Sequence, residues 1–170
     1  MFPVRLVGRR VTLREVTAAD LPAVGRVLDH PLIADRFACE EPVGALVVPG
    51  EPRVAYHLVV EKDQEVVGGG ALRITSTTHG RGEIGYVLHP DWWGQGLATE
   101  TARLLVELGI RDLGLHRIEA TVRDDNGGAQ RVCEKIGMRY EGRTRGYLLV
   151  GGVWRDSVRF ATLAGDGGQP

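Results

Sequence analysis

A glycine-rich turn near the middle of the chain limits which folds are open to it. The turn lies in the stretch "HPDWWGQGLATETARLLVELGI", and the preceding "GEIGYVLHP" has the pattern of a strand that Pro90 ends. After the turn, apolar and small residues repeat with a helical period from Leu97 to about Leu113. Two rows run along this helix: Leu97, Thr101, Leu104 and Leu108 in one, and Ala98, Ala102, Leu105 and Gly109 in the other. A strand, a turn and a helix with a seam of small residues predict a helix packed closely on a sheet.

Other strand and helix patterns surround this central unit. The strand patterns are 10–16, a hairpin over 54–75 with the turn "EKDQE", 116–126, and a second hairpin over 138–163 around Gly151-Gly152. The helix patterns are "TAADLPAVGRVLDH" (17–30) and "GGAQRVCEKIG" (127–137). Residues 40–53 hold three prolines and two glycines and are expected to form a loop. This order predicts an α/β fold in which a mixed sheet carries helices on its faces.

Charge and cysteine content argue against several classes of protein. Acidic residues number 22 and basic residues 21, so the net charge of −1 gives no electrostatic case for binding nucleic acid or a membrane. Cys39 and Cys133 cannot form a disulfide framework, and no metal-ligand spacing surrounds them. No apolar run approaches the roughly 18 residues of a membrane span. We therefore expect one cytoplasmic domain over residues 1–163 that binds no metal, followed by a disordered tail over 164–170.

The glycine-rich turn has two interpretations. Glycine commonly serves only to turn the chain. The first backbone amides of a helix, however, lack partners and lie at the positive end of its dipole, so they can bind an anion. Gly94, Gly96 and Ala98 have no side chains large enough to keep a bulky anion such as a pyrophosphate from these amides. The motif is neither a P-loop nor a Rossmann fingerprint, and the local pattern leaves both interpretations open.

Two segments around the turn resemble a known family. The order "EIGYVLHPDWWGQGLATE", then about twenty residues later "RIEATVRDDNGGAQRVCEKIGMRYEG", resembles the GNAT superfamily of acetyl-CoA-dependent N-acetyltransferases, in particular the RimJ/RimL-like branch that acetylates protein N-termini. The resemblance covers roughly Arg10 to Leu163 and is specific from Glu83 to Gly142. It implies a mostly antiparallel sheet of about six or seven strands, with helices on both faces and a splayed pair of parallel strands. It also implies direct attack of an amine on acetyl-CoA, the co-substrate, in a ternary complex.

The resemblance gives cofactor-binding roles to the turn and to the strand before it. The family's loop pattern, Arg/Gln-x-x-Gly-x-Gly/Ala, matches Trp93 to Ala98, with Trp93 in place of Arg or Gln. The loop amides would bind the diphosphate of coenzyme A, and strand amides would pair with its pantetheine arm as an added strand does. The implied cofactor-binding residues are Val87, Leu88, Trp93, Gly94, Gln95, Gly96, Leu97, Ala98, Thr99 and Asn126. Asn126 also suits a helix N-cap, and the two roles are compatible.

The catalytic groups match the family less completely. By resemblance, an amide near Tyr86 or Val87 polarises the acetyl carbonyl, where negative charge develops. Glu83 is the first candidate for the base, acting through water to keep the amine neutral, although it also suits a solvated carboxylate at a strand end. The family's usual proton donors are missing, because Ala129 stands at its Ser position and Cys133 at its Tyr position. Cys133 could donate from its thiol, or it could be only a small packed residue.

The acceptor amine is the least defined part of the site. We expect a primary amine, either a protein N-terminus or a small molecule. Further candidate residues are His79 and His89 as alternative bases, Tyr147 and Trp154 for the acceptor side, and Glu40, Glu41 and Glu51 for attracting a cationic amine. Two other interpretations stay open: a non-catalytic protein that binds or senses acyl-CoA, and a chain whose glycines only form a turn. Dimers are frequent among similar proteins, so the resemblance allows a homodimer.

Overall fold

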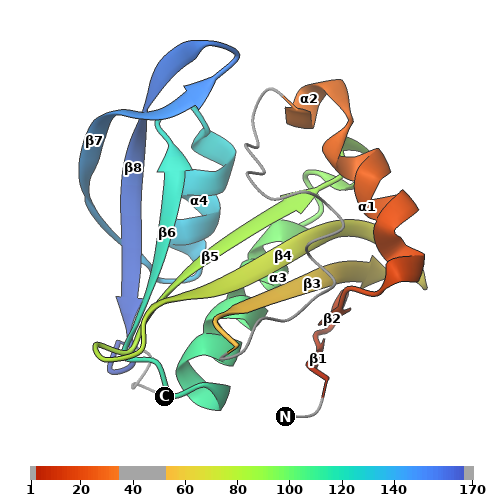
Figure 1. The fold of residues 1–170 in the computed structure, drawn as a ribbon, viewed down its shortest axis with the longest axis horizontal. Helices are drawn as coiled ribbons and strands as arrows, with labels where there is room; N and C mark the ends of the chain where they lie inside the picture. The colour runs from red at the N-terminus through yellow and green to blue at the C-terminus, as the bar shows by residue number, and fades with distance from the viewer. Residues whose placement is uncertain (1–2, 35–52, 167–170) are drawn as a thin grey trace.

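The chain forms an open sheet with helices on both faces (Figure 1). A computed structural model describes residues 3–34 and 53–166. The strands are β1 (Arg5–Val7), β2 (Thr12–Glu15), β3 (Ala55–Lys62), β4 (Glu65–Ser76), β5 (Arg81–Leu88), β6 (Arg117–Arg123), β7 (Arg139–Val150) and β8 (Val153–Leu163). Their order is β1-β2-β3-β4-β5-β6-β8-β7, and within the described residues β5 and β6 are the one parallel pair. The predicted mixed, mostly antiparallel sheet is confirmed.

The described residues contain one strand more than the sequence predicted. The additional strand is β1, which pairs antiparallel with β2 and places Leu6 opposite Leu13. Three residues are too few to establish a period of two, so the pattern did not reveal β1. The predicted loop over 40–53 lies outside the described residues except for Arg53, and β8 ends at Leu163 as predicted.

Helices cover the sheet from both sides. The helical elements are η1 (Ala18–Asp20), α1 (Leu21–Leu28), α2 (Pro31–Ala34), η3 (Pro90–Trp92), α3 (Leu97–Glu107), η4 (Leu108–Asp112) and α4 (Gly127–Lys135). Figure 1 shows α1 in front of the sheet, and α3 and α4 behind it. The larger core lies on the α3 side, where Leu105, Ile118 and Phe160 are almost fully buried. The helix predicted from Leu97 to about Leu113 is confirmed as α3 continued by η4.

Small residues on both elements let α3 and η4 lie close to the sheet. A Cβ atom at Gly109 would lie 2.4 Å from Cδ1 of Ile118 on β6. A Cβ atom at Gly70 on β4 would lie 3.2 Å from Cδ1 of Leu105 on α3. The small-residue seam predicted for the helix is therefore matched by a glycine, Gly70, in a facing strand, which the helical pattern alone does not reveal.

β5 and β6 stay together over only three residue pairs. Residues 81–83 pair with residues 117–119. Beyond this point β5 continues to Leu88 on β4, and β6 continues to Arg123 on β8. The two strands diverge (Figure 1), so each has one edge without a strand partner. The splayed parallel pair expected from the resemblance is confirmed, and it opens towards the glycine loop.

A buried ion pair joins the start of α1 to the sheet. Asp20 is 7% exposed, and its two carboxylate oxygens each accept a hydrogen bond of 2.7 Å from Arg14 on β2. Oδ2 also accepts from the amide and the hydroxyl of Thr17. The Arg14 guanidinium holds the pKa of the Asp20 carboxyl well below its usual range.

Replacing Asp20 by asparagine should lower the free energy of unfolding by about 1–2 kcal/mol at pH 7, because charge-assisted hydrogen bonds are lost. Since its folded pKa is depressed, the carboxylate stabilises the fold fully above its unfolded pKa of about 4. That stabilisation is lost as the pH falls through the folded pKa. Denaturant titrations at pH 7 and pH 3 should therefore give a smaller difference between parent and Asp20→Asn at pH 3. An equal difference at both pH values would contradict this account.

Candidate active site

A cavity of about 740 Å³ follows the gap between β5 and β6. Its walls are the unpaired part of β5, the glycine loop with the start of α3, the end of β6, and α4. Ile33 of α2 and Leu148 and Val150 of β7 also line it. The strand gap, the loop and α4 thus share one space.

The glycine loop and the first turn of α3 line this cavity. Gly94 and Gly96 have φ angles of 74° and 78°, a left-handed conformation that glycine adopts without strain. Gly96 is the N-cap of α3, and no side chain of the described residues caps this helix. The amides of its first turn therefore keep their hydrogen-bonding capacity and lie at the positive end of the helix dipole. This arrangement suits an anion.

The loop is held at both ends. At its start, Trp93 Nε1 donates a hydrogen bond of 2.8 Å to the Leu88 carbonyl of β5. At its end, Arg10 Nη1 donates to the Gln95 carbonyl at 2.6 Å, and the Arg10 amide donates to Glu100 Oε1 at 2.9 Å. Sequence reasoning missed Arg10 as a site residue, because this contact joins positions 85 residues apart and leaves no local pattern.

β5 carries unpaired amides along the gap. The His89 amide donates to the Val67 carbonyl of β4 at 2.9 Å. Because successive residues of a strand direct their amides to opposite sides, those of Leu88 and Tyr86 point towards the gap, and that of Val87 points towards β4. For the amide that would polarise the acetyl carbonyl, this geometry favours Tyr86 over Val87.

The side chains of Tyr86 and Cys133 both belong to the larger core on the α3 side of the sheet. The Tyr86 hydroxyl is buried without a hydrogen-bond partner among the described residues. Burial, together with the nearby Cys133, raises the pKa of Tyr86 well above its usual value, so the hydroxyl stays neutral. Burial also raises the pKa of the Cys133 thiol to about 11. Because an ordinary thiol has a pKa of about 8.5, Cys133 is the weaker acid, which favours its interpretation as a packed residue over a proton donor.

Glu83 lies where β5 and β6 begin to separate. Its carboxylate accepts a hydrogen bond of 2.7 Å from the Thr121 hydroxyl and one of 3.0 Å from Arg73. Thr121 lines the cavity. Glu83 does not, because the lining of the cavity begins at the next residue of β5, Ile84. A Cβ atom at Gly85, two residues further along β5, would meet nothing within 4 Å, so there is open space on this side of the strand. The Glu83 carboxylate therefore lies outside the cavity and is connected to it through the Thr121 hydroxyl.

Asn126 begins α4 at the wall of the cavity. Its Oδ1 accepts a hydrogen bond of 3.1 Å from the Ala129 amide, so the predicted role as a helix N-cap is confirmed. Asn126 and Ala129 both line the cavity, and Ala129 brings no side-chain donor to it. A contact between Asn126 and a cofactor stays a prediction.

Most of the predicted cofactor-binding residues come together around the cavity. Its lining includes Val87, Leu88, Trp93, Gly94, Gly96, Leu97, Ala98, Thr99 and Asn126. Gln95 is not part of the lining, since its carbonyl faces Arg10. Leu97 is 1% exposed, so its side chain belongs to the core and only its backbone can serve a ligand.

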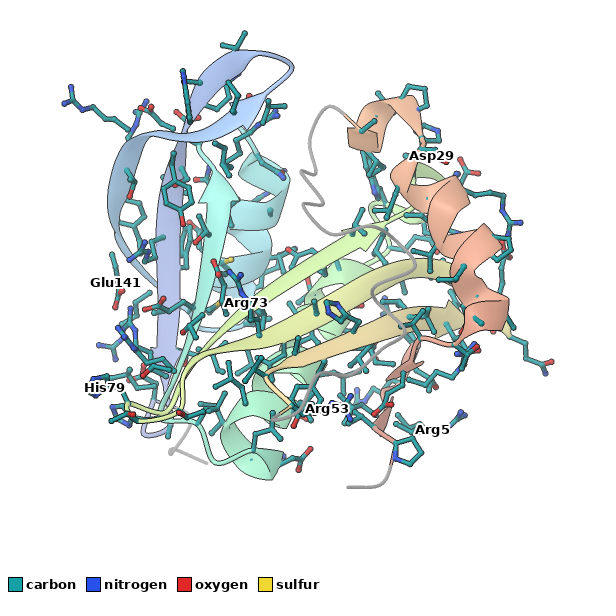
Figure 2. All side chains as sticks on the ribbon, in the orientation of Figure 1. Arg5, Asp29, Arg53, Arg73, His79 and Glu141 are labelled. Atoms are coloured by element: carbon teal, nitrogen blue, oxygen red, sulfur yellow. The ribbon has the colours of Figure 1, made fainter. Side chains whose placement is uncertain are left out.

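The remaining candidates are placed elsewhere. His79 lies in the turn before β5, at the opposite end of the strand from the glycine loop (Figure 2), so it is no neighbour of the cavity. The His89 ring packs edge-on against His30, with 4.9 Å between ring centroids. Tyr147 and Trp154 are exposed and do not line the cavity. Glu40, Glu41 and Glu51 lie outside the described residues.

Two kinds of feature are absent from the part of the chain that the structure describes. Its side chains include no group of three His, Cys, Asp or Glu residues arranged to hold a metal ion. None of its helices has the length and the apolar character needed to cross a membrane.

Known proteins resemble this chain in sequence and in fold. A family model described as "Acetyltransferase (GNAT) domain" matches residues 10–139. The uncharacterized N-acetyltransferase YnaD of Bacillus subtilis is 40% identical over 81 residues, 48% of either chain. The spermidine N(1)-acetyltransferase of Escherichia coli is 29% identical over 156 residues, 88% of this chain and 83% of that one. RimJ of Mycobacterium smegmatis, solved with CoA-disulfide, matches with a TM-score of 0.80 at 28% identity, covering 99% of this chain and 88% of RimJ. Matches to YnaD and two other curated relatives span only 48–61% of those proteins' lengths.

Proposed function

The chain belongs to the acetyltransferase (GNAT) family, and from this premise we propose that it transfers an acetyl group from acetyl-CoA to a primary amine. The observation that carries the proposal is a cavity in which the gap between β5 and β6 meets the start of α3, which no side chain of the described residues caps. A diphosphate suits the amides of Gly94–Thr99. A pantetheine arm suits the gap-facing amides of β5, beside which it would lie as an added strand.

In this proposal the amine attacks the thioester carbonyl, a C–N bond forms and the C–S bond breaks. The Tyr86 amide would donate a hydrogen bond to the carbonyl oxygen, where negative charge develops in the transition state. Glu83, linked to the cavity through Thr121, would accept a proton from the amine through water. The thiolate of coenzyme A would take its proton from solvent, because Ala129 offers no donor and burial makes Cys133 a weak one.

For the acceptor we propose a protein N-terminus or a small amine such as a polyamine. Beyond the gap, the described lining includes apolar side chains, Ile33 on one side and Leu148 and Val150 on the other. These three side chains suit the carbon chain of an amine rather than its charge. The relative named for spermidine supports the polyamine as one member of the panel to be tested.

The proposal is tested by following free thiol while the protein is incubated with acetyl-CoA and a panel of amines. The panel contains peptides with different N-terminal residues, polyamines and monoamines. We expect thiol release that depends on both acetyl-CoA and one class of amine, with the acetylated product seen by mass spectrometry. Absence of coenzyme A binding in calorimetry would overturn the proposal.

A second candidate function is binding or sensing of acyl-CoA without catalysis. The observation that favours it is the lack of an effective proton donor on α4, where Ala129 has none and the pKa of Cys133 is raised to about 11. This function predicts tight binding of acetyl-CoA with no thiol release across the whole amine panel.

Replacing Glu83 by glutamine should lower kcat/KM for the amine about 10-fold at pH 7, because the base is lost. The loss should shrink above pH 9, where the amine is increasingly neutral without help. Glutamine keeps an oxygen that can accept from Thr121, so the fold should be retained. The matched control is Glu119→Gln, since Glu119 pairs with Glu83 in register but bonds to Arg117. A loss that is equal in both variants, or independent of pH, would argue against Glu83 as the base.

A further inference from the structure

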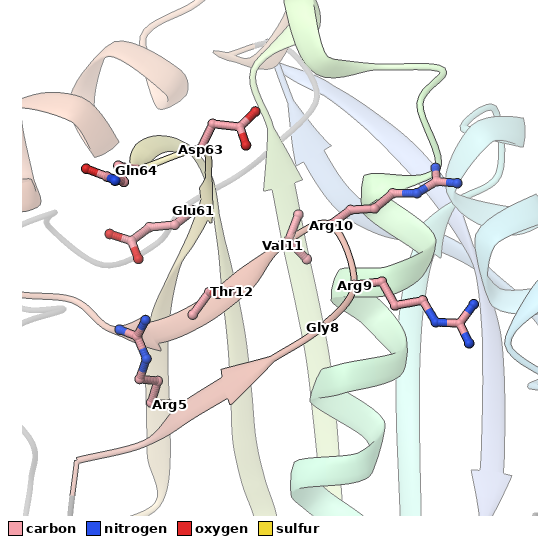
Figure 3. A pocket seen from close by; sticks show the side chains of 9 residues that line it. All are labelled: Arg5, Gly8, Arg9, Arg10, Val11, Thr12, Glu61, Asp63 and Gln64. Atoms are coloured by element: carbon pink, nitrogen blue, oxygen red, sulfur yellow. The ribbon is translucent and has the colours of Figure 1, made fainter.

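The turn between β1 and β2 lies against the start of α3. A Cβ atom at Gly8 would fall 2.2 Å from Glu100 Oε1, which shows how closely the turn approaches this side chain of α3. Figure 3 shows this turn beside a cavity of about 440 Å³. In that view the Arg10 side chain leaves the turn towards the loop before α3, away from Arg5.

The bond from Arg10 fixes one particular peptide group of the glycine loop. Its Nη1 donates to the Gln95 carbonyl at 2.6 Å. In a trans peptide the carbonyl and the following amide point in opposite directions. Because the Gln95 carbonyl points to Arg10, the Gly96 amide points away from Arg10. Gly96 lines the cavity between β5 and β6.

A flexible loop needs such a constraint. Gly94 and Gly96 both have positive φ angles, and glycine can leave this conformation as easily as it adopts it. No side chain of the described residues caps α3, so the helix itself does not fix the preceding peptide. The Arg10 side chain is the contact in the described residues that holds the Gln95–Gly96 peptide from outside the loop.

We propose that Arg10 is a positioning residue for the diphosphate of coenzyme A: it orients the Gln95–Gly96 peptide so that the Gly96 amide can donate to that diphosphate. This inference rests on the proposed function, since it assumes that the loop binds coenzyme A. It assigns to Arg10 an effect on cofactor affinity, and none on the acetyl-transfer step.

The first test compares three variants. Arg10→Ala should raise KM for acetyl-CoA about 10-fold, with kcat and KM for the amine unchanged, because one amide donor is no longer pre-oriented. Arg10→Lys keeps a donor for the Gln95 carbonyl and should recover most of the affinity. Arg9→Ala removes the same charge from the neighbouring exposed position and should leave KM unchanged, since the Arg9 side chain bonds to no described residue.

The second test uses acetyl-pantetheine, which lacks the diphosphate. Arg10→Ala should not change kcat/KM for this substrate, because the loop has nothing to bind. A rise in KM for both thioesters, or a fall in kcat alone, would overturn the proposal and indicate a general structural role.

If the parent protein transfers no acetyl group, the proposed function fails. Calorimetric titration with coenzyme A then tests the role of Arg10 separately. A Kd for coenzyme A that is the same in Arg10→Ala and in the parent protein would refute that role.

Discussion

Coenzyme A should bind about 100-fold more weakly to a Gly94→Asp variant than to the parent protein. Gly94 lies in the loop with φ of 74°, and a Cβ atom there would meet nothing within 4 Å. An aspartate side chain can therefore enter without a clash and carry its charge to the amides that would bind the diphosphate. A carboxylate about 6 Å from a phosphate charge costs about 3 kcal/mol at an effective dielectric constant of 20, which corresponds to about 100-fold in affinity.

The control for this experiment is Gly94→Asn. Asparagine has nearly the size of aspartate and tolerates positive φ equally well, so the two variants differ chiefly in charge. We expect asparagine to weaken binding only a few-fold, through the strain of the left-handed conformation. Calorimetric titration with coenzyme A measures both. Equal losses in the two variants would mean that side-chain bulk, and not charge near an anion, decides affinity.

Replacing Gly68 by alanine should lower the free energy of unfolding by about 3 kcal/mol, at the upper end of the usual range for overpacking. A Cβ atom at Gly68 would lie 2.2 Å from the Val87 carbonyl oxygen and 2.6 Å from Cδ2 of Leu88. The first of these is backbone of β5 and cannot rotate aside, so the strand itself must move. Because Val87 and Leu88 border the gap, the same variant should also bind coenzyme A more weakly.

Gly69→Ala is the matched control for this prediction. It lies next to Gly68 on β4, and its Cβ atom would be 3.6 Å from the Leu58 carbonyl oxygen, an ordinary contact. Alanine also restricts the unfolded chain more than glycine does, so we expect this variant to match or slightly exceed the stability of the parent. Denaturant unfolding monitored by circular dichroism measures both variants. Equal stability of Gly68→Ala and Gly69→Ala would refute the proposed clash.

The sequence predicted the parts of the fold that depend on local pattern. The helix from Leu97 and the turn at Gly151-Gly152 follow from periodicity and glycine placement, and both are confirmed. β1 was missed because three residues carry no period. The splay of β5 and β6 follows from no local property of either strand, and it was expected only through the resemblance to a family.

For the candidate site, the sequence predicted the glycine loop but not the distant contacts that hold it. Trp93 and Gly96 were predicted as site residues from the loop pattern, and both line the cavity. Arg10 and Thr121 were not, because their contacts with Gln95 and Glu83 join distant segments of the chain. Conversely, Trp154 was considered for the acceptor side and is 64% exposed, since aromatic type alone does not determine which face of a hairpin a residue occupies.

The short pairing of β5 with β6 also affects how the molecule holds together. Three residue pairs join a five-stranded part, β1 to β5, to a three-stranded part, β6 to β8, so the backbone ladder hardly connects them. Cohesion between these parts comes from side-chain packing, such as that around Gly109 of η4, which lies against Ile118 of β6 and Leu72 of β4. The junction between β5 and β6 should therefore open locally at a lower free energy than the hydrogen-bonded strand pairs on either side of it. A molecule bound in the gap between β5 and β6 would hydrogen-bond to both parts. It would make the two weakly joined parts unfold together in one cooperative transition.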